Sequence, residues 1–155
     1  MQADSRFAPR SPDFAERVRA SFARQKVMGT LGAQLIRILP GEVEIELPFR
    51  EDLTQQHGFL HAGVVTIVVD NACGYAAYSL MPPDASVLTV EYKVNFLAPA
   101  LGERFRARGA VVKAGQTITV CNGEAYALGA GGEKLVATMT ATMITLRSRP
   151  DLPPG

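Results

Sequence analysis

The chain has 155 residues, and its 16 lysines and arginines nearly balance its 15 aspartates and glutamates. This length suits one domain with its own core, and the balanced charge argues against nucleic acid or a membrane surface as a partner. The two cysteines, Cys73 and Cys121, lack the spacing of a zinc site, so we interpret them as reduced core residues, with a disulfide as the open alternative.

The N-terminal segment combines a polar stretch with a short helix. Residues 1–10 are polar, and we expect them to be disordered. They contain no apolar run typical of a signal peptide, so a cytoplasmic location is expected. A helix is predicted to begin at Ser11-Pro12-Asp13, where serine can cap free amides and proline tolerates the first position. Apolar side chains at four-residue spacing from Phe14 to Phe22 extend it to about Arg24.

Alternating apolar residues predict a β-hairpin over residues 35–47, with its turn at Pro40-Gly41. A polar loop then leads into residues 62–79, which are apolar on nearly every face of a helical wheel and therefore predict a buried helix. A strand of that length is unusual. A membrane span is disfavoured because Asp70 and Asn71 lie within the apolar run.

Four further strands are predicted over residues 87–96, 103–113, 117–128 and 134–146, and the last three form a meander. Strict alternation in the first of them places Leu88 and Phe96 on one face and Thr89 on the opposite, polar face. The tail, residues 147–155, is expected to be loose.

These elements predict an α+β fold with a single domain, residues 11–146. A helix that is apolar all round needs cover on every side, and one antiparallel sheet of about six strands supplies it only by curling around the helix. The open face of such a unit is closed most economically by a second copy of the chain. We therefore expect self-association.

The residues ahead of and within the apolar helix resemble a known family. Gln55, His61-Ala62-Gly63 and Asp70 stand at the family's spacing, and Thr89 to Ala100 forms the following strand. Over roughly residues 30–146 the chain resembles the hotdog-fold acyl-CoA thioesterases of the phenylacetate-degradation (PaaI-like) type. The resemblance implies a sheet wrapped round a central helix, a homodimer or homotetramer with active sites at the interface, and hydrolysis of an acyl-CoA thioester without metal or cofactor. Coenzyme A enters only as part of the substrate.

Elementary chemistry gives different tasks to the two ends of this motif. The start of a buried helix exposes backbone amides and the positive end of its dipole, which suits Ala62 and Gly63 to hold a developing oxyanion. The family commonly has glycine at position 62, and the methyl group of Ala62 can narrow the access of the acyl group. A carboxylate on an apolar helix is costly. We interpret Asp70 as a general base for water or a nucleophile on the thioester carbonyl. The alternative is a structural role, in which Asp70 caps a neighbouring loop or bonds to Asn71 or Thr66.

Ala62 and Asp70 are eight residues apart, which is about 12 Å along a helix and too far for both to act on one carbonyl. The oxyanion amide and the acid should therefore come from different subunits.

Three polar side chains are predicted to complete the site. Gln55 offers an amide that can hold the attacking water or the substrate oxygen, with a solvated loop position as the alternative. His61 is expected to orient the loop by hydrogen bonding or to cap the helix, and His57 is left outside the site. In the enzymes that the chain resembles, a Ser or Thr at the position of Thr89 helps to place the water near the acid; a purely structural place on the polar face of the strand is equally open.

Coenzyme A carries phosphates, so basic residues near the interface should matter. Arg104, Arg106 and Arg108 share one face of a strand, a pattern more typical of a solvated sheet face, and other candidates are Lys134, Arg147 and Arg149.

The first hypothesis for the function is hydrolysis of an aryl- or medium-chain acyl-CoA. A hotdog dehydratase needs a histidine paired with an acid, for which we find no motif. A non-catalytic acyl-CoA-binding module, the third hypothesis, gains nothing from a buried acid such as Asp70.

Overall fold

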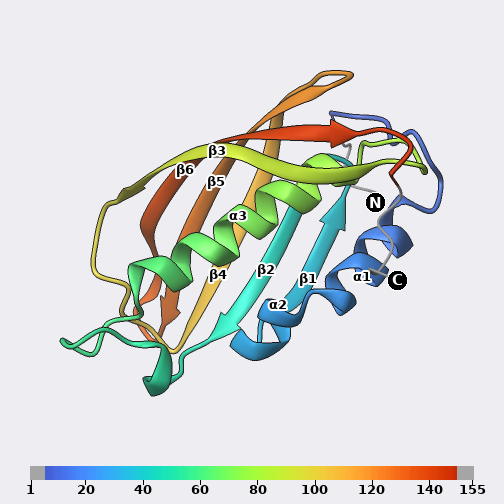
Figure 1. Ribbon diagram of the computed structural model, residues 1–155. Helices are drawn as coiled ribbons and strands as arrows, with labels where there is room; N and C mark the ends of the chain where they lie inside the picture. The colour runs from blue at the N-terminus through green and yellow to red at the C-terminus, as the bar shows by residue number, and fades with distance from the viewer. Residues whose placement is uncertain (1–5, 150–155) are drawn as a thin grey trace.

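The computed structural model describes residues 6–149, and Figure 1 shows a curved sheet with one long helix lying against it. The elements are α1 (Phe14–Arg24), α2 (Lys26–Leu31), β1 (Gln34–Leu39), β2 (Glu42–Pro48), the short 3-10 helix η1 (Glu51–Leu53), α3 (Ala62–Tyr78), β3 (Ser86–Phe96), β4 (Arg104–Ala114), β5 (Ile118–Gly129) and β6 (Gly132–Leu146). Parts of the predicted disordered N-terminus and loose tail, residues 1–5 and 150–155, lie outside the described residues. Phe7, in the predicted disordered segment, packs against the core.

The six strands form one antiparallel sheet in the order β1-β2-β4-β5-β6-β3. The predicted hairpin is β1 and β2, closed at Gly41, whose φ of 79° suits glycine. The predicted meander is β4, β5 and β6, and β3 pairs with β6 at the far edge. Because α3 lies against one face of this curved sheet (Figure 1), the predicted α+β hotdog architecture of six strands and one long helix is confirmed.

Two glycines let α3 pack closely on the middle of the sheet. Gly109 on β4 is paired with Gly123 on β5. A Cβ atom added to Gly109 would lie 2.2 Å from the backbone carbonyl carbon of Ala72, and one added to Gly123 would lie 2.5 Å from a methyl group of Val69. Real Cβ atoms do not approach other atoms so closely, so the contact with α3 requires glycine at both positions. Because Val69 faces the sheet, the next residue, Asp70, lies on a different side of the helix.

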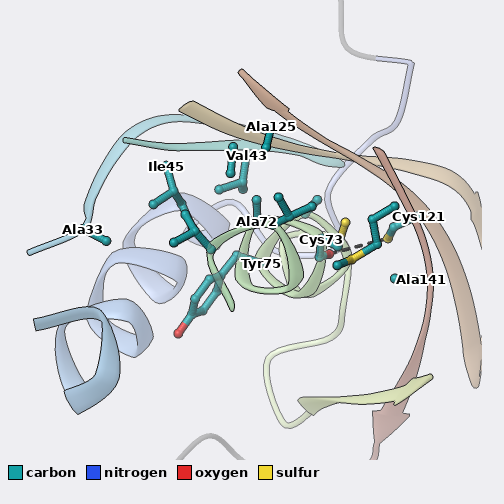
Figure 2. Close-up of a cluster of buried hydrophobic side chains, with 14 of the residues drawn as sticks. Ala33, Val43, Ile45, Ala72, Cys73, Tyr75, Cys121, Ala125 and Ala141 are labelled. Carbon is teal, nitrogen blue, oxygen red and sulfur yellow. Dashed lines mark hydrogen bonds between the residues drawn. The ribbon is translucent and has the colours of Figure 1, made fainter. Parts of the chain in front are cut away.

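Both cysteines lie in this contact, as Figure 2 shows. Cys73 and Cys121 are buried free thiols, which confirms their predicted place in the core and excludes the disulfide. The Cys121 thiol donates a weak hydrogen bond to the Cys73 carbonyl at 3.5 Å. Burial raises the pKa of Cys121 to about 12, so this thiol stays protonated and unreactive at neutral pH.

The first helix begins later than predicted. Ser11 lies in the turn before α1, where its hydroxyl is bonded to the Asp13 carboxylate, and Asp13 occupies the N-cap position of a helix that begins at Phe14. The predicted start at Ser11 is wrong because its side chain is bonded within the turn rather than to the helix amides. The short helix α2 follows at once and was not expected, since six residues are too few to show a period.

Helix α1 lies against the body of the fold. Val18 is completely buried, and the ring of Phe22 lies 5.8 Å from that of Tyr75 on α3. The Arg17 guanidinium donates hydrogen bonds to the carbonyl oxygens of Met81 and Pro82, at 3.1 and 3.0 Å. These contacts fix α1 beside the C-terminal half of α3.

The alternation predicted for β3 is wrong in its first half. Thr89 is paired with Met143 and Glu91 with Thr142, so the intervening Val90 forms a bulge. Residues directly opposite each other share a face of the sheet. Met143 is completely buried on the side of α3, and Thr89 therefore faces α3 as well. Without the bulge, Thr89 would lie on the outer face with Glu91, as the sequence predicts.

The prediction that α3 is buried all round is correct only for its C-terminal half. Every residue from Ala72 to Tyr78 is buried, whereas Ala62 and Gly63 are exposed and Asp70 is half-buried. One chain therefore leaves the first half of α3 partly uncovered. Within residues 6–149, no helix has both the length and the apolarity needed to cross a membrane.

Candidate active site

The carboxylate of Asp70 lies between α3 and β3. The Thr89 hydroxyl donates a hydrogen bond of 2.8 Å to Asp70 Oδ1, so the structure brings together two of the predicted site residues. Partial burial raises the pKa of the Asp70 carboxyl above its ordinary value, and the hydrogen bond from Thr89 opposes that shift. A carboxylate with a raised pKa is a stronger base than a fully solvated one.

The neighbours named as structural partners of Asp70 bond elsewhere. The Asn71 amide donates to the Ile67 carbonyl at 2.9 Å, and the Thr66 hydroxyl donates to the Ala62 carbonyl at 2.9 Å. Both bonds run back along α3. The position of Asp70 is therefore not explained by a bond to Asn71 or Thr66.

A cavity of about 250 Å³ opens beside this carboxylate. It lies between α1, α3 and the first half of β3, and its walls are partly polar and partly apolar. The lining residues are Ser21, Gln25, Asp70, Asn71, Gly74, Tyr75, Tyr78, Val87, Leu88 and Thr89. The acid thus faces a hollow that can admit water or part of a substrate. We call this hollow the acid-end cavity.

The first turn of α3 is capped by His61. The Gly63 N–H donates to His61 Nδ1 at 2.8 Å, and the amides of Val64 and Val65 donate to the His61 carbonyl. Within the described part of the chain, no group accepts a hydrogen bond from the Ala62 N–H. The two amides predicted for the oxyanion therefore differ: that of Gly63 serves the cap, and that of Ala62 is left for a ligand.

Gln55 is held in the loop that precedes α3. Its backbone N–H donates to the Phe59 carbonyl at 2.9 Å, and its side-chain oxygen accepts a hydrogen bond from the His57 N–H. Because the oxygen is engaged, the NH2 group of Gln55 is the part that can donate to a ligand. His57, which the sequence leaves outside the site, positions Gln55 through its backbone.

A second cavity, of about 510 Å³, lies at this end of α3. Gln55 and Ala62 both line it, and most of its other walls are apolar. They are formed by Phe59, Leu60, Val65, Phe96, Leu97, Ala98, Pro99, Ala100 and Val136. Hydrogen bonds from an amide to a developing negative charge are stronger in such surroundings than in water. We call this hollow the amide-end cavity.

The structure therefore divides the predicted site into two parts within one chain. Asp70 and Thr89 line the acid-end cavity, whereas Gln55 and Ala62 line the amide-end cavity. The stretch of α3 between Ala62 and Asp70 spans about 12 Å. One chain does not place its acid and its amide around a single carbonyl group.

The edge strand β3 and the loop after it expose apolar side chains beside both cavities. Leu88 and Val90 are 56% and 53% exposed, and Phe96, Leu97 and Leu101 are 49%, 55% and 66% exposed. An edge strand with a row of exposed apolar groups is typical of a surface that another molecule covers.

The predicted arginine stripe lies on the opposite face of the sheet from α3. Arg104 and Arg108 pair with carboxylates of the neighbouring strand β2, Glu46 at 3.2 Å and Glu42 at 2.8 Å. Arg106 pairs with Glu133 of β6, two strands away, at 2.7 Å. The pairs are consistent with a solvated sheet face, where such bridges contribute little. Phosphate groups of coenzyme A would have to compete with these carboxylates.

Among the lining residues of the acid-end cavity that the sequence motif does not include are Ser21, Gln25 and Tyr75. Ser21 and Gln25 come from α1 and its junction with α2, and both approach the Tyr75 hydroxyl on α3. Their four-residue spacing indicates a shared helix side, but it gives no sign of contact with α3.

Within residues 6–149, no cluster of three or more His, Cys, Asp or Glu side chains could hold a metal ion.

Residues 57–133 match the family model of the thioesterase superfamily. A solved structure of a thioesterase family protein from Silicibacter pomeroyi is 60% identical, covers 86% of this chain and 98% of its own, and has a TM-score of 0.85. The PaaI protein of the phenylacetic acid degradation operon of E. coli is 18% identical and shares the fold over 86% of this chain and 94% of its own, with a TM-score of 0.77.

The curated relatives are similar over shorter stretches of this chain than the Silicibacter structure is. The 1,4-dihydroxy-2-naphthoyl-CoA hydrolase of Listeria monocytogenes is 29% identical over 69 residues, which are 44% of this chain and 56% of that protein. The chain spans less than two thirds of the length of three of the curated relatives that it matches, namely 56%, 64% and 65%.

Proposed function

The chain belongs to the thioesterase superfamily, and we propose that it hydrolyses an acyl-CoA, with an aryl or medium-chain acyl group, to the free acid and coenzyme A. The observation that carries the proposal is the half-buried Asp70 carboxylate, hydrogen-bonded by Thr89 at the wall of a cavity. The name of the Listeria relative, a CoA-thioester hydrolase, supports the same reaction. A purely binding module would gain nothing from an acid that costs free energy to bury.

Asp70 acts on water in this proposal. Its carboxylate takes a proton from a water molecule while the water oxygen bonds to the thioester carbonyl carbon, and the carbonyl oxygen becomes an oxyanion. Collapse of this intermediate breaks the C–S bond, and the proton on Asp70 passes to the leaving thiolate. Thr89 keeps the carboxylate in position through its hydrogen bond.

Direct attack by Asp70 on the carbonyl carbon is the alternative route, and it passes through an anhydride between the acyl group and the enzyme. Single-turnover hydrolysis in heavy-oxygen water separates the two routes. Only the anhydride route can transfer the label to Asp70, which mass spectrometry of the peptide that contains it detects.

The oxyanion is stabilised by the amide end of a second subunit. The Ala62 N–H and the Gln55 NH2 are the donors, and removal of one such donor typically slows catalysis by about 10²–10³-fold. The separation of about 12 Å along α3 supports a site shared between two chains. The exposed apolar side chains of β3 support a homodimer, and the resemblance to the PaaI-like enzymes extends this to a homotetramer.

A thiol-release assay over a panel of acyl-CoAs tests the function. We expect the wild type to hydrolyse aryl or medium-chain members, and Asp70→Asn to lower kcat roughly 10³-fold. Asp84→Asn, the same change at an exposed position, is the matched control. If Asp70→Asn keeps nearly all of the rate, the assigned role of Asp70 is wrong. If no ester is hydrolysed but CoA esters bind, the non-catalytic acyl-CoA-binding module is the better reading.

Mixing two inactive variants tests the shared site. Asp70→Ala and Gln55→Ala chains, each inactive alone, should form heterodimers in which one of the two sites has both Asp70 and Gln55 intact. Random exchange makes half of the dimers mixed, so about a quarter of the wild-type activity should return. Failure to recover activity, with heterodimers demonstrated by mass spectrometry, contradicts a site built from two chains.

A further inference from the structure

The Thr89 hydroxyl lies between two hydrogen-bond acceptors. Its oxygen is 2.8 Å from Asp70 Oδ1 and 3.5 Å from Met143 Sδ. A threonine hydroxyl carries one proton, and the sulfur of methionine is a weak acceptor. Thr89 can therefore donate to the carboxylate or to the thioether, but not to both at once.

The bulge at Val90 brings the thioether to this hydroxyl. Thr89 is the direct partner of Met143 across β3 and β6, so the two side chains share the face of the sheet that is turned toward α3. Met143 is completely buried, and its sulfur is closed to water. Methionine often serves only as a flexible filler of a core. Here the contact with Thr89 links it to the reacting acid.

The two acceptors serve different protonation states of Asp70. While Asp70 is a carboxylate, a charge-assisted hydrogen bond keeps the Thr89 proton at Oδ1. In the proposed reaction an O–H bond of water breaks, and its proton bonds to the Asp70 carboxyl. Once that proton lies on Oδ1, the carboxylic acid donates and the Thr89 oxygen accepts. The Thr89 hydroxyl must then donate elsewhere, and Met143 Sδ is within reach.

Water in the acid-end cavity is a competing acceptor in the free enzyme. The cavity is roomy beside the acid: a Cβ atom added to Gly74, one turn after Asp70, would meet no heavy atom within 4 Å beyond its own stretch of helix. A substrate whose thioester group reaches Asp70 displaces the water from beside Thr89. The thioether stays, because Met143 is part of the core.

We propose that Met143 is a positioning residue for the hydrolysis: its thioether accepts the Thr89 proton while Asp70 is protonated, and it thereby stabilises the tetrahedral intermediate. This inference rests on the proposed function and adds a residue that acts only through Thr89. When the proton passes from Asp70 to the leaving thiolate, the Thr89 hydroxyl turns back to Oδ1. The bond to the carboxylate is the stronger one, so Thr89 as a whole still lowers the pKa of Asp70.

The other ionisable groups around Asp70 stay in one charge state while it titrates. Among the residues that line the acid-end cavity, the phenols of Tyr75 and Tyr78 are the other titratable groups, and α1 and β3 contribute none. Arg17 of α1 lies over the Tyr78 ring, 4.8 Å from its centre. Burial raises the pKa of Cys73, three residues after Asp70, well above its ordinary value, so that thiol stays neutral. A shift of the acid limb between variants therefore reports Asp70.

Met143→Leu tests the role of the sulfur, because it keeps nearly the same volume and cores tolerate such changes. With the acyl-CoA that the wild type hydrolyses fastest, we expect kcat to fall about threefold, the size of one weak hydrogen bond. KM should not change, since the bond forms only after the proton has moved. The midpoint of the kcat–pH profile should fall by about half a unit, opposite in sign to the effect of losing the Thr89 hydroxyl.

Met139→Leu is the matched control. Met139 lies four residues before Met143 on the same face of β6, is also buried, and pairs with Val94 instead of Thr89. This variant should keep the wild-type kcat and pH profile. If the two leucine variants change both quantities alike, the effect comes from core packing and the inference is wrong.

A double-mutant cycle separates the hydroxyl from the general surroundings of the acid. Thr89→Val leaves no proton for the sulfur, so adding Met143→Leu to it should change neither kcat nor the pH profile. A downward shift that persists in that background overturns the inference. An unshifted profile for Met143→Leu alone also overturns it, because the proton of Asp70 then lies on Oδ2 and Thr89 keeps its bond to Oδ1.

Titration of Asp70 without substrate separates this inference from the proposed function. Carbon NMR of labelled aspartate carboxyls, assigned with Asp70→Asn, should show a smaller downward pKa shift in Met143→Leu, since water competes in the free enzyme. If no ester is hydrolysed but this shift occurs and vanishes with Thr89→Val, the proposed function fails and the link from Met143 to Asp70 is supported. If esters are hydrolysed and neither kcat nor the pKa responds, the inference alone fails. If there is neither hydrolysis nor a shift, both fail.

Discussion

The two sides of α3 are built in opposite ways. On the sheet side, the helix lies so close to Gly109 and Gly123 that an added Cβ atom would overlap with it. On the other side, Asp70 and Gly74 face a cavity of about 250 Å³. Both sides depend on glycine, but for opposite reasons: the glycines of the sheet admit the helix, whereas the glycine of the helix leaves room for a ligand.

This difference separates what stabilises the protein from what it does. Close packing on β4 and β5 fixes the position and rotation of α3, so Asp70 is held on a rigid element. The acid itself costs free energy to bury. Asp70 lies on the cavity side of α3, which we call the open side, and receives a hydrogen bond from Thr89 there. The acid is therefore not part of the tightly packed core.

The sheet side of α3, which we call the closed side, should not tolerate one extra methyl group. The loss of stability from such a change is the largest that we expect. Gly109→Ala should destabilise the fold by about 3 kcal/mol or more, because the backbone of α3 would have to move away from the sheet. Gly74→Ala, on the open side, should stabilise it by roughly 0.5–1 kcal/mol. Urea unfolding measures both.

Gly129→Ala at the end of β5 is the control for these two changes, because a Cβ atom added there also meets nothing within 4 Å. Its stability should stay close to that of the wild type. Equal stability of Gly109→Ala and Gly74→Ala would remove the distinction between a closed and an open side.

The open side should depend on the hydrogen bond from Thr89. Thr89→Val is expected to lower kcat/KM about tenfold. It should also shift the midpoint of the pH–rate profile upward, because the lost bond is the interaction that lowers the Asp70 pKa against desolvation. Thr140→Val, on the exposed outer face of β6, is the matched control. A slower enzyme with an unshifted profile would show that Thr89 does not act through Asp70.

The smallest expected effect is the stability cost of Asp70 itself. Desolvation raises its pKa in the folded protein above the ordinary 3.8, so the folded state holds this proton more tightly than the unfolded state. The associated stability is fully present below the ordinary pKa and is lost as the pH rises through the raised one. Asp70→Asn should therefore be more stable than the wild type at neutral pH. In thermal unfolding the two should converge in acid, and a constant difference at every pH would contradict this linkage.

Most regular elements were predictable because hydrophobic periodicity reports burial directly. The hairpin, α3 and the three-stranded meander lie within one or two residues of their predicted bounds. The exceptions are short or local. The six residues of α2 make less than two turns, and the Ser11 hydroxyl bonds to Asp13 instead of capping α1.

Thr89 shows why the site was harder to predict than the fold. Its residue type was recognised, but strict alternation places it on the wrong face of β3, and only the bulge at Val90 turns it toward Asp70. A bulge depends on how two distant strands pair, which the alternation of one strand does not reveal. Gln25 likewise meets Tyr75 across 50 residues of sequence.

The amino-acid sequence by itself determined the order of the elements, the family resemblance, and which chemical groups are available: one costly acid, a helix start with a usable amide, and Gln55 ahead of it. These follow from short-range periodicity and spacing, which are local properties of the chain. Only the tertiary structure decided that Thr89 meets Asp70 and that Gly74 opens a cavity toward α1. Each of these depends on which distant segments pack together, and packing is set by the whole fold rather than by any one stretch of sequence.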